Sequence, residues 1–148
     1  MKTLLAILIL AAFLQSAILP LNLVLVILLI RAYVRPNKND LYLAFFFGLL
    51  TSFLENYPLG VHSLIYLLLV QLTHSFARLP VAKNIFSQTV LIFISLLVND
   101  LTISLIFKTS WQIWPKLLLE IILVFPVYFL VNFWEERFIF KKEIKLKI

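Results

Sequence analysis

The stretch that decides the fold is Gly48-Leu-Leu-Thr-Ser-Phe-Leu-Glu-Asn-Tyr-Pro-Leu-Gly60, which holds both glycines of a 148-residue chain. Gly48 lies in an apolar run, where a missing Cβ lets a neighbouring helix approach closely. In the second half, Pro58 presets φ and Gly60 supplies a positive φ if the turn is of type II. We therefore predict that one helix ends here, the chain reverses tightly, and the next helix begins, with Glu55 at the reversal.

The composition around this stretch predicts an integral membrane protein. Hydrophobic residues make up 63% of the chain and charged residues 14%, and the mean hydropathy is +1.05. Soluble domains are about half apolar and about a quarter charged. Since so short a chain cannot bury this much apolar surface internally, the bilayer must act as its solvent. The absence of cysteine excludes disulfides, thiolate catalysis and Cys-ligated metals.

Six apolar segments predict an all-α fold, a polytopic bundle of six transmembrane helices in one domain over residues 1–134, followed by a basic tail over 135–148. A spanning helix needs about 20 residues, so the second and third segments must be tilted, shielded by neighbours or extended by their flanks. The first two segments are contiguous, but Pro20 and Asn22 favour two short helices over one long helix. The segments are Leu4–Leu19, Leu21–Val34, Leu41–Leu54, Val61–Phe76, Ile85–Phe107 and Pro115–Phe133.

The basic residues set the expected orientation, because Lys and Arg accumulate on the cytoplasmic side of a membrane. With six spans and both termini inside, eleven of the 13 bases lie inside, and merging the first two helices leaves ten inside. In the tail we favour a partly ordered basic segment over an interfacial helix. The inner bases are Lys2, Arg31, Arg35, Lys38, Arg78, Lys83, Arg137, Lys141, Lys142, Lys145 and Lys147, and the outer bases are Lys108 and Lys116.

The sequence makes no positive case for an enzyme or a cofactor. His62 and His74 lie at opposite ends of one predicted helix, about 18 Å apart by helical rise, so they cannot share a metal ion. We interpret both as interfacial histidines without a special role. No nucleophile motif, phosphate-binding loop or paired-carboxylate spacing is present.

Five ionisable groups are predicted to share one outer layer: Glu55, Asp100, Lys108, Lys116 and Glu120. Acids within a membrane are costly and indicate function by default. One hypothesis is that they enclose a water-reachable cavity or form an interface for another membrane protein. The alternative is that each acid is satisfied locally, as Lys116 and Glu120 can be through their i, i+4 spacing.

The opening stretch resembles the rod shape-determining MreD family. The residues that carry the resemblance are Gly48-Leu49-Leu50, Pro58-Leu59-Gly60 and Tyr66 in the following helix. In that family an Asp usually follows the Gly-Leu-Leu-x positions, and here Ser52 stands at that place. Glu55, about one helical turn later, is the candidate to replace the acid.

The resemblance implies a non-enzymatic membrane scaffold of the bacterial cell elongation machinery, which helps to regulate cell shape and lateral peptidoglycan synthesis. Its expected partners are the lipid bilayer, an MreC-like single-span protein, the actin-like MreB and a RodA-type glycosyltransferase–transpeptidase pair. The family fold is similar to the S components of energy-coupling factor transporters. The second hypothesis is therefore a subunit that binds a small ligand, a vitamin or a metal, near the outer face. We lean toward the scaffold because the small-residue docking face expected of an S component is only loosely present.

Overall fold

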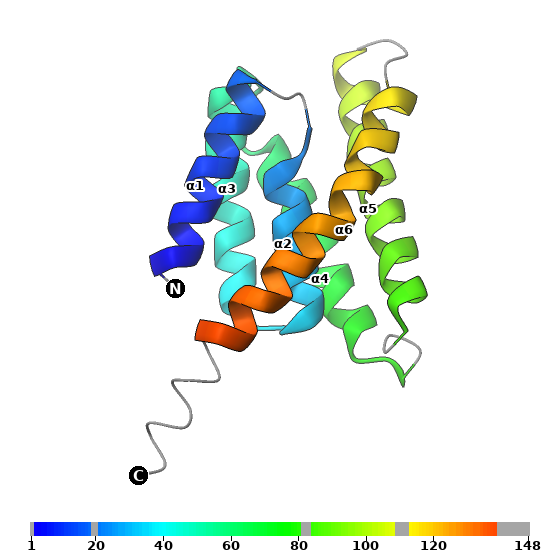
Figure 1. Cartoon of the computed structure of the whole chain (residues 1–148). Helices are drawn as coiled ribbons and strands as arrows, with labels where there is room; N and C mark the ends of the chain where they lie inside the picture. Colours follow the sequence, from blue (N-terminus) through cyan, green and yellow to red (C-terminus); the bar gives the residue numbers. More distant parts are fainter. Residues whose placement is uncertain (1, 19–20, 81–83, 109–112, 139–148) are drawn as a thin grey trace.

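The computed structural model describes residues 2–18, 21–80, 84–108 and 113–138, and in these ranges the chain is all-α, with six helices and no strand. The helices run alternately up and down, as Figure 1 shows. They are α1 (Lys2–Ala17), α2 (Leu23–Val34), α3 (Asn39–Leu54), α4 (Val61–Ala77), α5 (Ile85–Phe107) and α6 (Ile113–Phe138).

The sequence located all six helices to within a few residues. The predicted separation of the first two segments is confirmed, since α1 ends at Ala17 and α2 begins at Leu23. Pro20, to which we assigned the break, lies outside the described residues, as do Lys83, Lys141 and Lys142. The last helix continues to Phe138, four residues beyond the predicted domain boundary at residue 134.

Helix α2 is the centre of the bundle and packs against each of the other five helices. Ten of its 12 residues are buried. At 1.5 Å per residue the helix is only about 18 Å long, much shorter than a hydrocarbon core of about 30 Å. We predicted that a short segment must be tilted, shielded by its neighbours or extended by its flanks. Helix α2 is shielded, because its neighbours surround it and leave little of its surface for solvent or lipid to contact.

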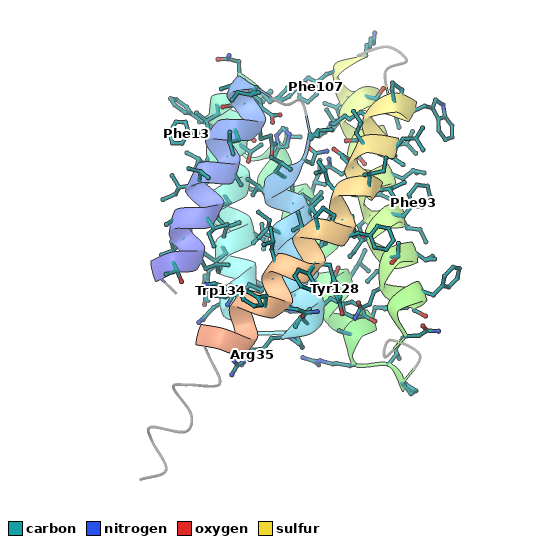
Figure 2. The ribbon with its side chains drawn as sticks, viewed as in Figure 1. Phe13, Arg35, Phe93, Phe107, Tyr128 and Trp134 are labelled. Atoms are coloured by element: carbon teal, nitrogen blue, oxygen red, sulfur yellow. The ribbon has the colours of Figure 1, made fainter. Side chains whose placement is uncertain are left out.

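The charged residues divide between the two ends of the bundle. The lower end in Figure 1, where α2 and α4 end and α3 begins, carries Arg31, Arg35, Lys38 and Arg78, and Figure 2 labels Arg35 there. The upper end, where α3 and α5 end and α4 and α6 begin, carries Lys108 and Lys116. The separation predicted from the sequence therefore exists in the fold for the bases whose side chains are described.

Helices α3 and α4 form the most extensive helix pair, and Gly48 lies where their backbones come close. A Cβ on Gly48 would lie 2.5 Å from the Ser63 Cα, inside any permitted contact. The Ser63 hydroxyl donates to the Phe45 carbonyl at 3.0 Å and ties the two helices at the same level. The predicted close approach of a neighbouring helix is thus confirmed.

The reversal between α3 and α4 has the positive φ predicted at Gly60. Gly60 has a φ of 103°, a left-handed conformation that favours glycine. Asn56 adds a second positive φ of 58°, which asparagine tolerates better than most residues. The Tyr57 N–H donates to the Ser52 carbonyl at 2.9 Å and closes the end of α3.

The outward faces of the helices around α2 are strongly apolar. Large exposed side chains include Leu105, Phe129 and Leu68, at 79%, 70% and 66% exposure, and Figure 2 shows Phe13 projecting outward from α1. Two stretches, Phe86–Phe107 and Trp114–Trp134, are long and apolar enough to cross a membrane, and only 33% and 22% of them is buried within the protein. A core helix of a soluble protein would be mostly buried.

Candidate functional site

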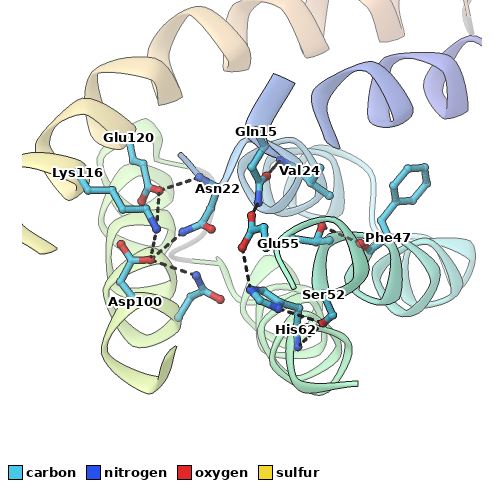
Figure 3. Close-up of polar contacts among 12 residues, drawn as sticks. Gln15, Asn22, Val24, Phe47, Ser52, Glu55, His62, Asp100, Lys116 and Glu120 are labelled. Atoms are coloured by element: carbon cyan, nitrogen blue, oxygen red, sulfur yellow. Dashed lines mark hydrogen bonds and ion pairs between the residues drawn. The ribbon is translucent and has the colours of Figure 1, made fainter. Parts of the chain in front are cut away.

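The upper end of the bundle encloses a carboxylate cluster, which we define as Asn22, Asn99, Asp100, Lys116 and Glu120 (Figure 3). Asp100 Oδ1 accepts hydrogen bonds from Asn22 Nδ2 at 2.7 Å, Lys116 Nζ at 3.0 Å and Asn99 Nδ2 at 3.2 Å. Glu120 Oε1 accepts from the Asn22 backbone N–H at 2.8 Å and lies 3.9 Å from Lys116 Nζ. Both carboxylates are buried, Glu120 to 1% exposure. A single ammonium therefore serves two buried acids.

A second group, the histidine cluster, lies beside it and consists of Gln15, Ser52, Glu55 and His62. Gln15 Nε2 donates to Glu55 Oε1 at 2.6 Å, and Glu55 Oε2 lies 3.5 Å from His62 Nε2. The other ring nitrogen, Nδ1, is 3.1 Å from the Ser52 hydroxyl. His62 is completely buried, and its ring is held from both sides by residues of the α3 end.

The two clusters meet at the start of α2. Gln15 Oε1 accepts from the Val24 N–H at 3.2 Å, and Asn22, two residues earlier, belongs to the carboxylate cluster. Together the clusters take polar groups from all six helices or their caps (Figure 3). A layer that includes every helix fixes how the helices sit relative to one another at this end.

The structure brings together four of the five residues predicted for the outer layer. Asp100, Lys116 and Glu120 are in direct contact, and Glu55 is close enough for the charges of Lys116 and Asp100 to act on it. Lys108 instead caps the end of α5 in a left-handed conformation and is exposed. Thus the layer is mostly internal, with Lys108 on its rim.

The residues that carry the family resemblance divide by burial. Gly48, Ser52 and Tyr66 are buried, Leu49 and Leu50 are partly exposed, and Pro58 and Leu59 are exposed on the turn. The Tyr66 ring stands edge-on to the His62 ring, with the centroids 5.9 Å apart. Of the buried members, Ser52 belongs to the histidine cluster and Tyr66 contacts its imidazole ring.

A separate ionic group, the inner cluster, lies at the lower end and consists of Arg31, Asp40 and His74. Arg31 Nη1 is 2.8 Å from Asp40 Oδ1, and His74 Nε2 is 3.4 Å from Asp40 Oδ2. The Asn37 N–H donates to the same Oδ2 at 3.0 Å. All three members of the cluster are buried. We predicted Arg31 to be a base that sets the topology, but its guanidinium pairs with the buried Asp40 carboxylate inside the protein.

We predicted both histidines to be interfacial and without a special role; they lie at opposite ends of α4, as predicted, but both are buried within the bundle. His62 is fully buried and His74 is 7% exposed, because each has a carboxylate partner inside the bundle. Sequence reasoning also missed Gln15 and Asp40 as members of buried networks. The available signal was a polar residue isolated among apolar neighbours, but the partner comes from a different helix, 40 residues away for Gln15 and Glu55. Such pairs become visible only after folding.

Burial raises the pKa of the Glu55 carboxyl above its ordinary value of 4.5. The hydrogen bond from Gln15 and the charge of Lys116 oppose this rise, while the charge of Asp100 adds to it. A raised pKa means that the folded protein holds this proton more tightly than the unfolded chain does. Glu55 is therefore a group whose ionisation works against the fold.

We expect Glu55→Gln to stabilise the protein progressively as the pH rises from the ordinary glutamate range through the raised pKa of Glu55. In that window the unfolded chain has already released the proton that the folded chain still holds, so wild-type stability falls with pH. The glutamine amide of the variant does not titrate, so its stability lacks this fall. The measurement is the melting temperature in detergent at several pH values for wild type and variant.

Lys108→Gln, at the same end, is the control for this experiment and should differ from wild type by an amount that does not change across the window. A Glu55→Gln difference that stays constant or shrinks as the pH rises would contradict the assignment.

The described residues contain no group of three or more His, Cys, Asp or Glu side chains placed to hold a metal ion. Comparisons of the chain with protein-family models, with curated proteins and with solved structures give no match.

Proposed function

We propose that this chain is an integral protein of the bacterial cytoplasmic membrane, with six spans and both termini in the cytoplasm. The apolar outward faces, the two long exposed helices and the separation of bases between the two ends support this placement. Four helices, α1 to α4, are shorter, and they fit a membrane as a group because α1, α3 and α4 pack against the buried α2. Alkaline extraction should leave the chain in the membrane pellet.

Within that membrane we propose a non-enzymatic scaffold of the cell elongation machinery, as the resemblance to MreD implies. The observation that carries the proposal is the buried polar layer, in which side chains from all six helices or their caps contact one another. Such a layer holds the helices as one body and favours a rigid protein that presents a surface to partners. Lateral peptidoglycan synthesis and cell shape would be regulated through those partners.

Glu55 is a suitable replacement for the family acid whose place Ser52 occupies. Ser52 contacts one nitrogen of the His62 ring and Glu55 lies near the other. A carboxylate at either position reaches the same imidazole from the end of α3. We therefore propose that Glu55 takes the place of the family acid and that its contact with His62 holds the start of α4 against the end of α3.

The proposal is tested by affinity capture of the tagged chain from membranes of its own bacterium. We expect an MreC-like single-span protein in near-stoichiometric amount, with MreB and a RodA-type synthase pair in smaller amounts. Depletion of the chain should turn rod-shaped cells round. Normal rods after depletion, together with an ATPase pair in the captured fraction, would contradict the scaffold.

The burial of Asp100 and Glu120 directs the search for a partner contact toward the exposed rim of the layer. We expect Lys108→Glu to reduce capture of the MreC-like protein a fewfold, because reversal of a rim charge acts on association more than on folding. Lys38→Glu, an exposed base at the opposite end, is the matched control and should leave this capture unchanged. Equal capture by both variants would remove Lys108 from the interface.

One observation favours the S-component alternative. Asp100 Oδ2 and Glu120 Oε2 are buried and have no hydrogen-bond partner in the described part of the chain. Two such oxygens are suitable for binding a cationic or hydrogen-bond-donating small molecule. Native mass spectrometry of the purified protein tests this alternative. A vitamin that is tightly bound to wild type, and is lost when Asp100→Asn is combined with Glu120→Gln, would support the ligand-binding subunit.

A further inference from the structure

A large groove runs along the outside of α3 and α4 at the lower end of the bundle, with a volume of about 1040 Å³. Its mouth is polar and includes Lys38 before α3, Arg78 at the end of α4, and Asn37. Its wall further along the helices is apolar and aromatic, with Tyr42, Phe45 and Phe46 from α3 and Leu67 from α4. The groove is thus charged at one end and apolar at the other.

The charge at the mouth is positive and uncompensated. The lining residues that the structure describes include two bases and no carboxylate. Within the described part of the chain, neither Lys38 nor Arg78 has an ion-pair partner. The nearby acid, Asp40, is fully buried and already bound by Arg31 and His74. Among the described residues, an anion at the mouth would therefore meet two free cations and no opposing charge.

The dimensions match a lipid that lies along the helices. Lys38 and Phe46 are eight residues apart, about 12 Å of helix, and Arg78 and Leu67 are eleven apart, about 16 Å. The aromatic wall is solvent-exposed in the isolated chain, Tyr42 to 68% and Phe46 to 64%. An occupant that covers this surface must be apolar and about as long as the groove. A small hydrophilic anion alone would leave the aromatic wall uncovered.

We propose that this groove is a binding site for one anionic glycerophospholipid of the cytoplasmic leaflet. Its phosphate lies between Lys38 and Arg78, and one acyl chain lies against Tyr42, Phe45, Phe46 and Leu67. Asn37 and Ser75 supply neutral hydrogen-bonding groups at the headgroup level. The inference rests on the membrane placement proposed above and goes beyond the scaffold function.

The test is native mass spectrometry of the full chain, purified in detergent and titrated with phosphatidylglycerol or phosphatidylcholine. We expect wild type to prefer phosphatidylglycerol. Lys38→Gln with Arg78→Gln should weaken phosphatidylglycerol binding about thirtyfold, since each base near an anionic lipid is worth about fivefold. Leu67→Trp fills the apolar part of the groove and should weaken both lipids without a change of charge.

Lys108→Gln removes a base at the opposite end and is the matched control, which should bind phosphatidylglycerol as wild type does. A second measurement needs no variant: higher salt should weaken phosphatidylglycerol binding to wild type. Glycerol 3-phosphate at millimolar concentration should not displace the lipid. Displacement by that anion, or equal lipid binding by wild type and the Lys38/Arg78 double variant, would overturn the site.

Alkaline extraction separates this result from the membrane placement. A chain that stays in the membrane pellet but shows no preference for phosphatidylglycerol overturns the groove alone. A chain that leaves the pellet overturns the membrane placement on which the groove rests.

Discussion

Arg31→Met should lower the free energy of unfolding by about 3–5 kcal/mol, the usual cost of removing one partner from a buried ion pair. The Asp40 carboxylate is 1% exposed at the side chain and lies 2.8 Å from the guanidinium. Without Arg31, the partners that this charge keeps among the described residues are His74 and the Asn37 N–H. The measurement is denaturant unfolding in micelles, followed by far-ultraviolet circular dichroism.

Two further variants make this prediction specific to the pair. Arg31→Met combined with Asp40→Asn should regain most of the lost stability, because the asparagine amide has no charge to compensate and its oxygen still accepts from the Asn37 N–H. Lys38→Met, a change at an exposed base of the same end, should cost less than about 0.5 kcal/mol. If the double variant is as unstable as Arg31→Met alone, the guanidinium acts through packing and not through Asp40.

Gly48→Ala should destabilise the protein by about 1–3 kcal/mol. Alanine is worth about 1 kcal/mol more than glycine inside a helix, so propensity alone predicts the opposite sign. The close contact decides the outcome, because the new Cβ would lie 2.5 Å from the Ser63 Cα and 2.7 Å from the Ser63 backbone nitrogen. These are backbone atoms, so α4 itself must move. The measurement is again unfolding in micelles.

Ser63→Gly tests that explanation, since it leaves the Cα in place and should not rescue Gly48→Ala. Gly60 is the opposite case, in which there is space for a Cβ but the backbone conformation is unfavourable for most other residues. An alanine Cβ at Gly60 meets no atom within 4 Å, so any cost of Gly60→Ala comes from its φ of 103°, and Gly60→Asn should cost less than Gly60→Ala because asparagine tolerates a positive φ. Rescue of Gly48→Ala by Ser63→Gly would show that the serine side chain, not the backbone, is the obstacle.

The sequence by itself located the six helices, the break before α2 and the reversal between Asn56 and Gly60. These features depend on local properties: a run of apolar residues, a proline, and a glycine where φ must be positive. It also placed Lys108 and Lys116 at one end and Arg31, Arg35, Lys38 and Arg78 at the other, because helix lengths and alternation fix the end at which a residue lies.

The tertiary structure decided which polar residues meet and which are buried. Asn22 and Asp100 are 78 residues apart, and Asn22 and Glu120 are 98 apart. No periodicity specifies such pairs, since each depends on how α2, α5 and α6 cross. The same holds for the burial of both histidines.

The tertiary structure also made α2 the central helix. Its apolar run resembles those of its neighbours, and little in the local sequence distinguishes it except its length. Only the packing shows that the other five helices surround it. A helix of about 18 Å can therefore bury its apolar surface against its neighbours. The sequence therefore determined the elements and their ends, and the crossing of the helices determined the interior, because side-chain contacts between distant segments exist only once the segments are assembled.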